Sequence, residues 1–134
     1  MSATQVEHAT TGPLAAAISN GVVHLVLEYT GRGPTRARTH ITDELISVVL
    51  EDTLTKGERS LVEDGKTALV LDARKAYQQT MRRDLIAMVE EATGRKVRAF
   101  LSDNHMEPDV AIESFLLEPQ LDEHRQNGGA PPTS

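Results

Sequence analysis

Residues 30–39 constrain the fold more than any other part of this chain, since they read Thr-Gly-Arg-Gly-Pro-Thr-Arg-Ala-Arg-Thr. Glycines can adopt positive φ, and Pro34 both fixes its own φ and disfavours the helical region for Gly33. A helix that approaches this stretch must therefore end near Tyr29, and the chain must leave it extended. The sequence thus predicts a helix, a sharp turn and a strand, with Gly31 or Gly33 at positive φ.

Two arginines follow the turn at alternate positions, so a strand would project both from one face. They form a cationic strip on a chain whose formal net charge is −6. Such a strip can hold a phosphate bidentately or meet a carboxylate on another subunit. The predicted anion- or partner-binding site comprises Gly31, Arg32, Gly33, Pro34, Arg36 and Arg38. The structural alternative is a helix C-cap, a turn and solvated arginines on an edge strand.

Length and composition limit the architecture to one domain. The 134 residues, 39% of them hydrophobic, suffice for one core but not for two. Residues 1–12 and 119–134 are polar or rich in Gly and Pro, which predicts disordered tails around a domain at 13–118. The negative net charge disfavours general binding to nucleic acid, and no apolar run is long enough for direct membrane insertion. The absence of cysteine excludes disulfides and is compatible with a cytoplasmic location.

The spacing of apolar residues predicts three helices and four strands. The helices are expected at 13–29, 56–63 and about 70–92, and the strands at 35–41, 44–51, 97–102 and 110–117. Thr55 and Glu58 have the spacing of a capping box, while Gly65 and Gly94 suit helix C-termini. The order αββααββ indicates an α+β sandwich, with helices on one face of a mainly antiparallel four-stranded sheet.

Side-chain alternation in the strands predicts an apolar patch on the face without helices. Val49 lies opposite the more buried side of its strand, and Phe100 and Phe115 alternate away from the residues expected in the core. A patch of this kind favours burial by a second copy or a partner protein. We therefore expect a homodimer or an obligate complex. The arginines of the long helix, Arg74, Arg82 and Arg83, are expected on a solvated face.

No catalytic or cofactor motif emerges from the sequence. The best cluster of metal-ligand side chains is residues 103–109, with His105 among three carboxylates, but its spacing is that of ordinary turn chemistry. Nucleophile elbows, phosphate-binding loops and paired metal-binding histidines are missing. We therefore expect no enzyme activity, no cofactor and no metal.

Three blocks of the sequence resemble a bacterial family known as the MpsC-like domain. They lie in order at residues 31–38, 52–61 and 93–103, and the resemblance runs from about Ile18 to Glu118. The family is named for an accessory subunit of a sodium-translocating, membrane-potential-generating system, whose larger partners are linked to inorganic-carbon uptake. The resemblance implies a peripheral cytoplasmic subunit at the inner face of the membrane, with a membrane transport system as protein partner. It carries over no catalytic residue.

The predicted order of elements also resembles the bacterial type of KH domain, which binds single-stranded RNA through a Gly-x-x-Gly loop between adjacent helices. The corresponding junction here, residues 62–66, is acidic and has one glycine. Our first hypothesis is therefore a non-enzymatic accessory or regulatory module that docks on a protein partner. The alternative is KH-like RNA binding, and the third is an enzyme that acts on a small anion through Arg36 and Arg38.

Overall fold

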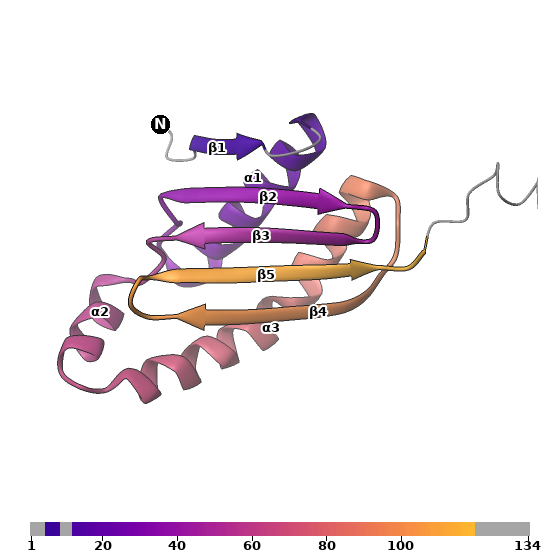
Figure 1. Cartoon of the computed structure of the whole chain (residues 1–134). Coiled ribbons are helices and arrows are strands. Elements are labelled where there is room, and N and C mark those ends of the chain that lie inside the picture. Colours follow the sequence, from indigo (N-terminus) through magenta and orange to yellow (C-terminus); the bar gives the residue numbers. More distant parts are fainter. Residues whose placement is uncertain (1–4, 9–11, 120–134) are drawn as a thin grey trace, which may run out of the picture.

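The computed structural model describes residues 5–8 and 12–119, which form three helices and a five-stranded sheet (Figure 1). The elements follow the order β1 (Gln5–His8), α1 (Gly12–Thr30), β2 (Arg36–Thr42), β3 (Leu45–Glu51), α2 (Lys56–Glu63), α3 (Thr67–Thr93), β4 (Val97–His105) and β5 (Val110–Leu117). From α1 onward this is the predicted αββααββ order, which is confirmed. The strand β1 was not predicted. Of the predicted tails, residues 1–4, 9–11 and 120–134 lie outside the described residues, while Gly12 begins α1 and Pro119 is described without regular secondary structure.

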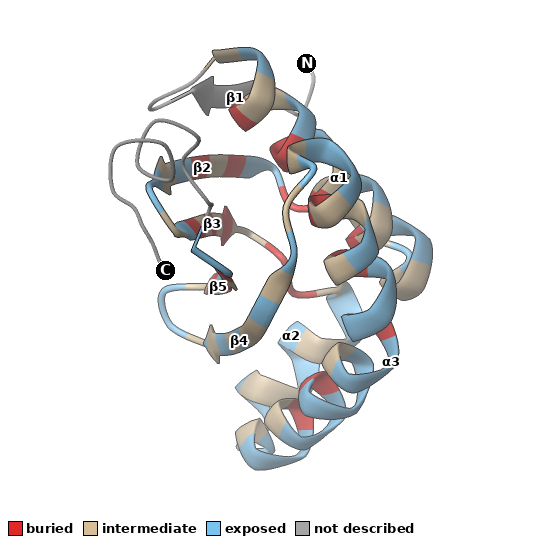
Figure 2. Cartoon of the chain, turned by 90° about the vertical axis from the view of Figure 1, so that its right-hand side faces the viewer, coloured by how far each residue is buried: buried red, intermediate tan, exposed pale blue. Residues whose placement is uncertain are grey.

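The sheet has the strand order β1-β2-β3-β5-β4, in which only β1 pairs in parallel, with β2. The four predicted strands therefore form the antiparallel part of the sheet, as expected. Because β5 enters between β3 and β4, β4 becomes an edge strand. Figure 2 shows α1 and α3 on one side of the sheet, while the described elements leave the other side uncovered.

The core lies between the sheet and the two long helices. The buried residues of α1 recur at helical spacing and include Ile18, Val22 and Val26, which pack with Leu85 and Val89 of α3. At Gly21 the two helices approach closely, since a Cβ built there would lie 2.6 Å from the Met88 sulfur. A larger residue at this position would require the Met88 side chain to move aside.

The short helix α2 begins with the predicted capping box. The Glu58 amide donates to the Thr55 hydroxyl over 3.1 Å, and the Thr55 amide donates to the Glu58 carboxylate over 2.9 Å. Both predicted helix ends are also confirmed: Gly65 follows α2 with φ of 80°, and Gly94 follows α3 with φ of 72°.

The predicted facing of β4 and β5 was wrong. Phe115 is fully buried in the core, and its ring centroid lies 5.1 Å from that of Phe100. Leu101 and Ile112, expected in the core, are 63% and 42% exposed on the other face. The error arose because Val110 and Ile112 were expected in the core, whereas the core face of β5 carries Phe115 together with Glu113, a residue type that is rarely buried.

In β4 a register shift between Val97 and Ala99 changes which side chains face the core. The extra residue allows Val97 and Phe100 to pack against the core although they are three positions apart. The strand also continues to His105, so the predicted loop 103–109 is shorter than expected.

Steps of three and four residues from Val70 to Ala92 predict one apolar stripe along α3, and this prediction is partly wrong. Val70, Met81 and Leu85 are buried, but Ala73, Tyr77 and Ala92 are exposed or only partly covered, and Arg74 takes an inward position. The expectation of a solvated Arg74 is therefore wrong.

Candidate functional site

The predicted turn after α1 is present, and the prediction of positive φ is confirmed at Gly31. This residue has φ of 82°, and its amide donates to the Leu27 carbonyl over 2.8 Å to close the helix. Gly33 is not among the residues with positive φ, and Pro34 is buried. The turn therefore rests on one left-handed glycine followed by one buried proline.

The predicted arginines do not converge on one point. Arg32 pairs with Asp52 at the base of the hairpin, with a nitrogen–oxygen distance of 2.7 Å. Arg36 and Arg38 lie further along β2 on the uncovered sheet face, where Arg38 pairs with Glu51 over 3.2 Å. Both pairs are about one-third exposed, so they are screened by solvent and contribute little to stability. The predicted site is thus divided: Arg32 lies at the turn, whereas Arg36 and Arg38 lie on the sheet.

The uncovered side of the sheet is hereafter called the open face. Its apolar part includes Leu45, Leu101 and Ile112, all more than 40% exposed, together with half-buried Val49 and Leu116. The strand register aligns Arg38, Val49, Ile112 and Asp103 in one row across β2, β3, β5 and β4. This row has a cation at one end, a carboxylate at the other and two aliphatic side chains between them.

Asp52 joins the turn to α2. It has φ of 61°, a left-handed conformation that aspartate tolerates better than most residues. Its carboxylate forms ion pairs with Arg32 over 2.7 Å and with Arg59 over 3.2 Å. Its amide donates a hydrogen bond to the Asp109 carbonyl. Three segments far apart in sequence are therefore tied together at this residue.

Thr53, the residue after Asp52, belongs to a hydrogen-bond network centred on Arg74, which is only 6% exposed. Its guanidinium donates to both Glu58 carboxylate oxygens, over 2.9 and 2.6 Å, a bidentate arrangement. It also donates to the Thr53 carbonyl over 2.8 Å and to the Thr53 hydroxyl over 3.0 Å. That hydroxyl donates in turn to Asp109, whose second oxygen accepts from the Leu54 amide. Asp109, one of the carboxylates of the predicted loop, is thus occupied in holding the chain together.

The pKa of Glu58 reflects this network. Burial by itself would raise the pKa of this carboxyl, but hydrogen bonds from Arg74 and Thr55 stabilise the anion and lower the pKa below its usual value. Glu58 is therefore charged together with Arg74, and this pair is structural in character.

Glu113 is a buried carboxylate, 3% exposed and located on the core side of β5, whereas Glu58 is only partly buried. Burial raises its pKa to about 7, against the opposing influence of the Ser102 hydroxyl and the Arg74 guanidinium. Neither Oε1 of Glu113 nor Oγ of Ser102 has a well-formed hydrogen bond. Burial therefore dominates.

A small cavity adjoins this carboxylate. Its volume is about 20 Å³, enough for one water molecule, and its polar lining includes Thr53, Arg74, Asn104 and Glu113. A single bound water there would supply the missing partner for Glu113. The cavity has no room for an organic substrate, and no group of three or more metal-ligand side chains occurs in the described part of the chain.

Comparison with known proteins gives one match. A family model described as "Na+-translocating membrane potential-generating system (MpsC)" matches residues 10–119, which is most of the chain. The chain belongs to the MpsC family. Searches of curated proteins and of solved structures found no match.

The three blocks that carried the MpsC resemblance have identifiable structural roles. Residues 31–38 form the turn and the first half of β2, and residues 52–61 supply Asp52, Thr53 and Glu58 to the ion-pair network. Residues 93–103 contain the C-cap of α3 and most of the edge strand β4. Each block of this MpsC chain therefore lies either beside the β2–β3 hairpin or in the edge strand β4.

Sequence reasoning missed Arg74 and Glu113 as buried polar residues. One signal was available for Glu113, since Ala111, Phe115 and Leu117 share its parity and are apolar enough to form a core face. For Arg74 the signal was weaker: its helical spacing to Val70, Met81 and Leu85 fits the apolar stripe as well as Ala73 does. Only the position of Glu58 shows why an arginine belongs there.

Proposed function

We propose that this MpsC chain is a non-enzymatic accessory or regulatory subunit of a sodium-translocating, membrane-potential-generating system. The family description supports the system, and the open face is the observation that supports a role in assembly. A sheet face with exposed Leu45, Leu101 and Ile112 gains free energy when another protein covers it. The cavity beside Glu113 is too small for an organic substrate, and the described residues hold no group of three or more metal-ligand side chains.

The charges of the open face favour a second copy of the chain as its cover. A two-fold axis parallel to the strands would stack β2 of one copy on β4 of the other. In the row already described, Arg38 would then face Asp103 of the second copy, and Val49 would face Ile112. This row is therefore complementary to itself in both charge and apolar surface, and we propose a homodimer.

The larger partner is proposed to be a membrane transport system. No helix among the described residues is long and apolar enough to cross a membrane. A subunit built in this way would attach through protein contacts, which we place at the cytoplasmic surface of the membrane. Inorganic-carbon uptake is the transport process that the resemblance suggests for the complex.

KH-like RNA binding is the weaker alternative. The junction between α2 and α3 follows Glu63 and contains Asp64, and its one cation, Lys66, pairs with Asp64 over 2.7 Å. A phosphate backbone would meet carboxylates at this position. RNA binding also predicts an affinity that falls steeply with salt, whereas an apolar sheet contact should change little.

A charge exchange on the open face tests the assembly. Asp103→Arg should convert the dimer to a monomer in sedimentation experiments, since Arg38 of one copy would face an arginine of the other. Adding Arg38→Asp should restore the dimer by restoring the pair in reverse. Glu91→Arg, an exposed carboxylate on α3, is the control and should leave the dimer intact. A monomeric wild-type protein at micromolar concentration contradicts the homodimer.

Affinity purification from native membranes tests the larger partner. The tagged wild-type chain should retain the integral membrane subunits of the sodium-translocating system after solubilisation in mild detergent. A chain that retains none of these subunits, yet is folded and dimeric, contradicts the proposed role.

A further inference from the structure

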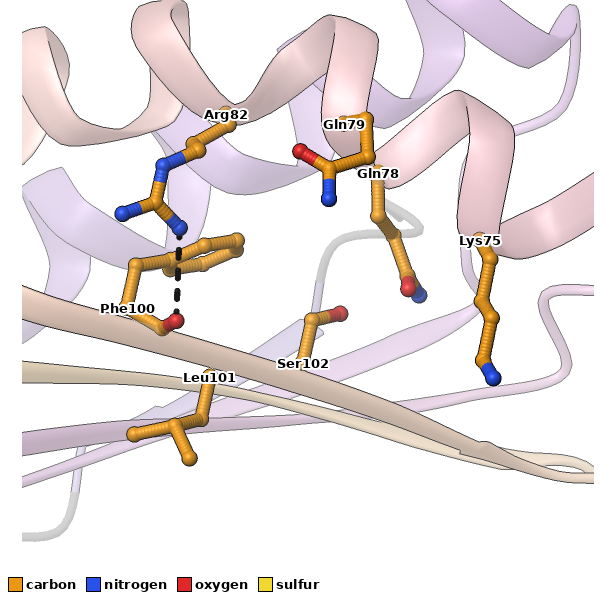
Figure 3. Close-up of a pocket in the computed structure, with 7 residues that line it drawn as sticks. All are labelled: Lys75, Gln78, Gln79, Arg82, Phe100, Leu101 and Ser102. Atoms are coloured by element: carbon orange, nitrogen blue, oxygen red, sulfur yellow. Dashed lines mark hydrogen bonds between the residues drawn. The ribbon is translucent and has the colours of Figure 1, made fainter.

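A groove runs between α3 and the outer edge of β4, on the side of β4 that faces away from β5. In Figure 3, Lys75, Gln78 and Arg82 reach from α3 towards the strand. Phe100 and Ser102 point back from β4, whereas Leu101 points to the opposite side of the strand. This part of the groove has a volume of about 340 Å³.

A second part of about 320 Å³ shares Lys75, Gln78 and Ser102 with the first. It continues along the strand to Asp103 and Asn104, and its helix side includes Asp72. The two parts together follow β4 from Phe100 to Asn104, which is about 13 Å of extended chain.

The edge of β4 presents backbone hydrogen-bonding groups to this groove. In an antiparallel ladder, every second residue of an edge strand directs its N–H and C=O away from its neighbour. The Phe100 carbonyl accepts from Arg82 at 3.5 Å, and the Asn104 amide donates to the Asp103 side chain at 2.9 Å, so neither group bonds to β5. By the same alternation, Ser102 directs its N–H and C=O into the groove.

We propose that this groove binds an extended, acidic segment of a partner protein, which adds to β4 as a further strand. This inference rests on the proposed function, because it assigns the surface through which the subunit engages its larger partner. The segment would bond to the backbone at Phe100, Ser102 and Asn104 and place alternate side chains against α3.

The charges of the first part of the groove argue for an acidic segment, because Lys75 and Arg82 line it without a carboxylate, whereas Asp72 and Asp103 lie only in the second part. Lys75 makes no ion pair with any described residue. Arg82 lies 5.7 Å from the centre of the Phe100 ring and makes only its long hydrogen bond to the Phe100 carbonyl. Carboxylates that enter between these two cations would gain charge-assisted hydrogen bonds. The Phe100 ring, half-buried at the base, would contact an aliphatic side chain of the same segment.

A second copy of this chain fits the groove poorly. Pairing two β4 edges about a two-fold axis would bring the α3 helices alongside each other, with Lys75 and Arg82 of both copies crowded together. Like charges in such an arrangement oppose binding, and charged residues beside an edge strand are a common protection against self-pairing.

The test uses a fluorescent probe peptide of about nine residues that alternates glutamate with valine, since such a sequence is extended and acidic. Fluorescence anisotropy should show saturable binding to the full chain. A matched peptide that alternates lysine with valine should bind at least tenfold more weakly. N-methylation of the peptide on alternate residues should abolish binding in one register and leave it unchanged in the other, because only one set of amides faces β4.

Variants of the protein locate the binding site. Lys75→Glu combined with Arg82→Glu should reverse the preference, so that the lysine peptide binds more tightly than the glutamate peptide. Arg83→Glu, an exposed neighbour that does not line the groove, should leave the preference unchanged. Circular dichroism would confirm that both variants are folded.

Several results would overturn the inference. They are the absence of saturable binding, equal effects of N-methylation in both registers, and an unchanged preference in the double variant. If Asp122→Lys with Glu123→Lys raises the affinity for the probe more than tenfold, the chain's own carboxy-terminal segment is the occupant. If the double variant alters sedimentation but not peptide binding, the edge contacts a second copy. A positive peptide result without co-purified membrane subunits would instead count against the proposed function alone.

Discussion

Replacing Glu113 by glutamine should change how stability depends on pH. The carboxyl is 3% exposed, and burial raises its pKa from the usual 4.5 to about 7. Below pH 4.5 it is protonated in both the folded and the unfolded chain and has no effect. As pH rises from 4.5 to about 7, the unfolded chain loses this proton while the folded chain keeps it, so the free energy of unfolding falls.

The size of the effect follows from the same two values. The rise from 4.5 to about 7, at about 1.4 kcal/mol for each tenfold change in proton affinity, corresponds to roughly 3 kcal/mol. The wild-type chain should therefore lose roughly this much stability across the interval and then level off. Glu113→Gln has no charge to bury, so its advantage over the wild type should grow from its value near pH 4.5 by the same amount.

Urea denaturation followed by circular dichroism, at several values from about pH 5 to about pH 9, measures this difference. The protein concentration must be fixed, because dimerisation would add to the apparent stability. The exposed carboxylate Glu91 provides the matched control, Glu91→Gln, which should follow the wild type at every pH. Parallel curves for Glu113→Gln and the wild type would refute the reasoning, since they would mean that Glu113 titrates alike in both states. Glu58 does not affect this comparison. Because its pKa is lowered in the folded chain, its contribution to stability is lost only as pH falls below 4.5.

Three further predictions concern single contacts. Arg74→Met should lower the free energy of unfolding by about 2 kcal/mol or more, because it leaves the partly buried Glu58 and the carbonyl of buried Thr53 without their partner. Arg83→Met on the exposed side of α3 should cost less than about 0.5 kcal/mol. Equal losses would show that the network is not structural. Gly31→Ala should lower the free energy of unfolding by about 1 kcal/mol because Gly31 has φ of 82°. Gly33→Ala should be nearly neutral, since the nearest atoms to the added Cβ lie at 3.6 Å. The reverse order of stabilities in thermal melts would contradict the turn as described. Changing Arg36 and Arg38 together to glutamine should weaken the dimer in sedimentation while the melting temperature stays within a few degrees, and a large loss of stability would instead make these arginines structural.

Local sequence signals predicted the elements of this fold correctly where the cause is local. The capping box at Thr55 and Glu58 depends on two side chains and two amides a single turn apart, so its spacing is sufficient to predict it. Gly31, Gly65 and Gly94 end their helices because only glycine adopts positive φ without cost. The resemblance to the MpsC family likewise rests on three short stretches of sequence, and it is confirmed.

The candidate surfaces were less predictable, because each depends on which strands become neighbours. The strand order puts β5 between β3 and β4, and this decides that β4 has a free edge and a groove beside α3. The register decides that Arg38, Val49, Ile112 and Asp103 form one row. No local pattern specifies pairings between strands that are separated by two helices.

The sequence by itself therefore determined the three helices, the four antiparallel strands, the turn at Gly31 and the family, since these follow from backbone preferences and short-range spacing. Tertiary structure alone decided the facing of β4 and the burial of Arg74. For β5 the parity shared by Ala111, Phe115 and Leu117 was a sequence signal, and tertiary structure decided that the Glu113 carboxyl enters the core with them. The physical reason is that a polar side chain can enter the core when distant groups satisfy or neutralise it. Thr53 and Glu58 do so for Arg74, whereas Glu113 is accommodated by a pKa that keeps its carboxyl protonated over a wider range of pH.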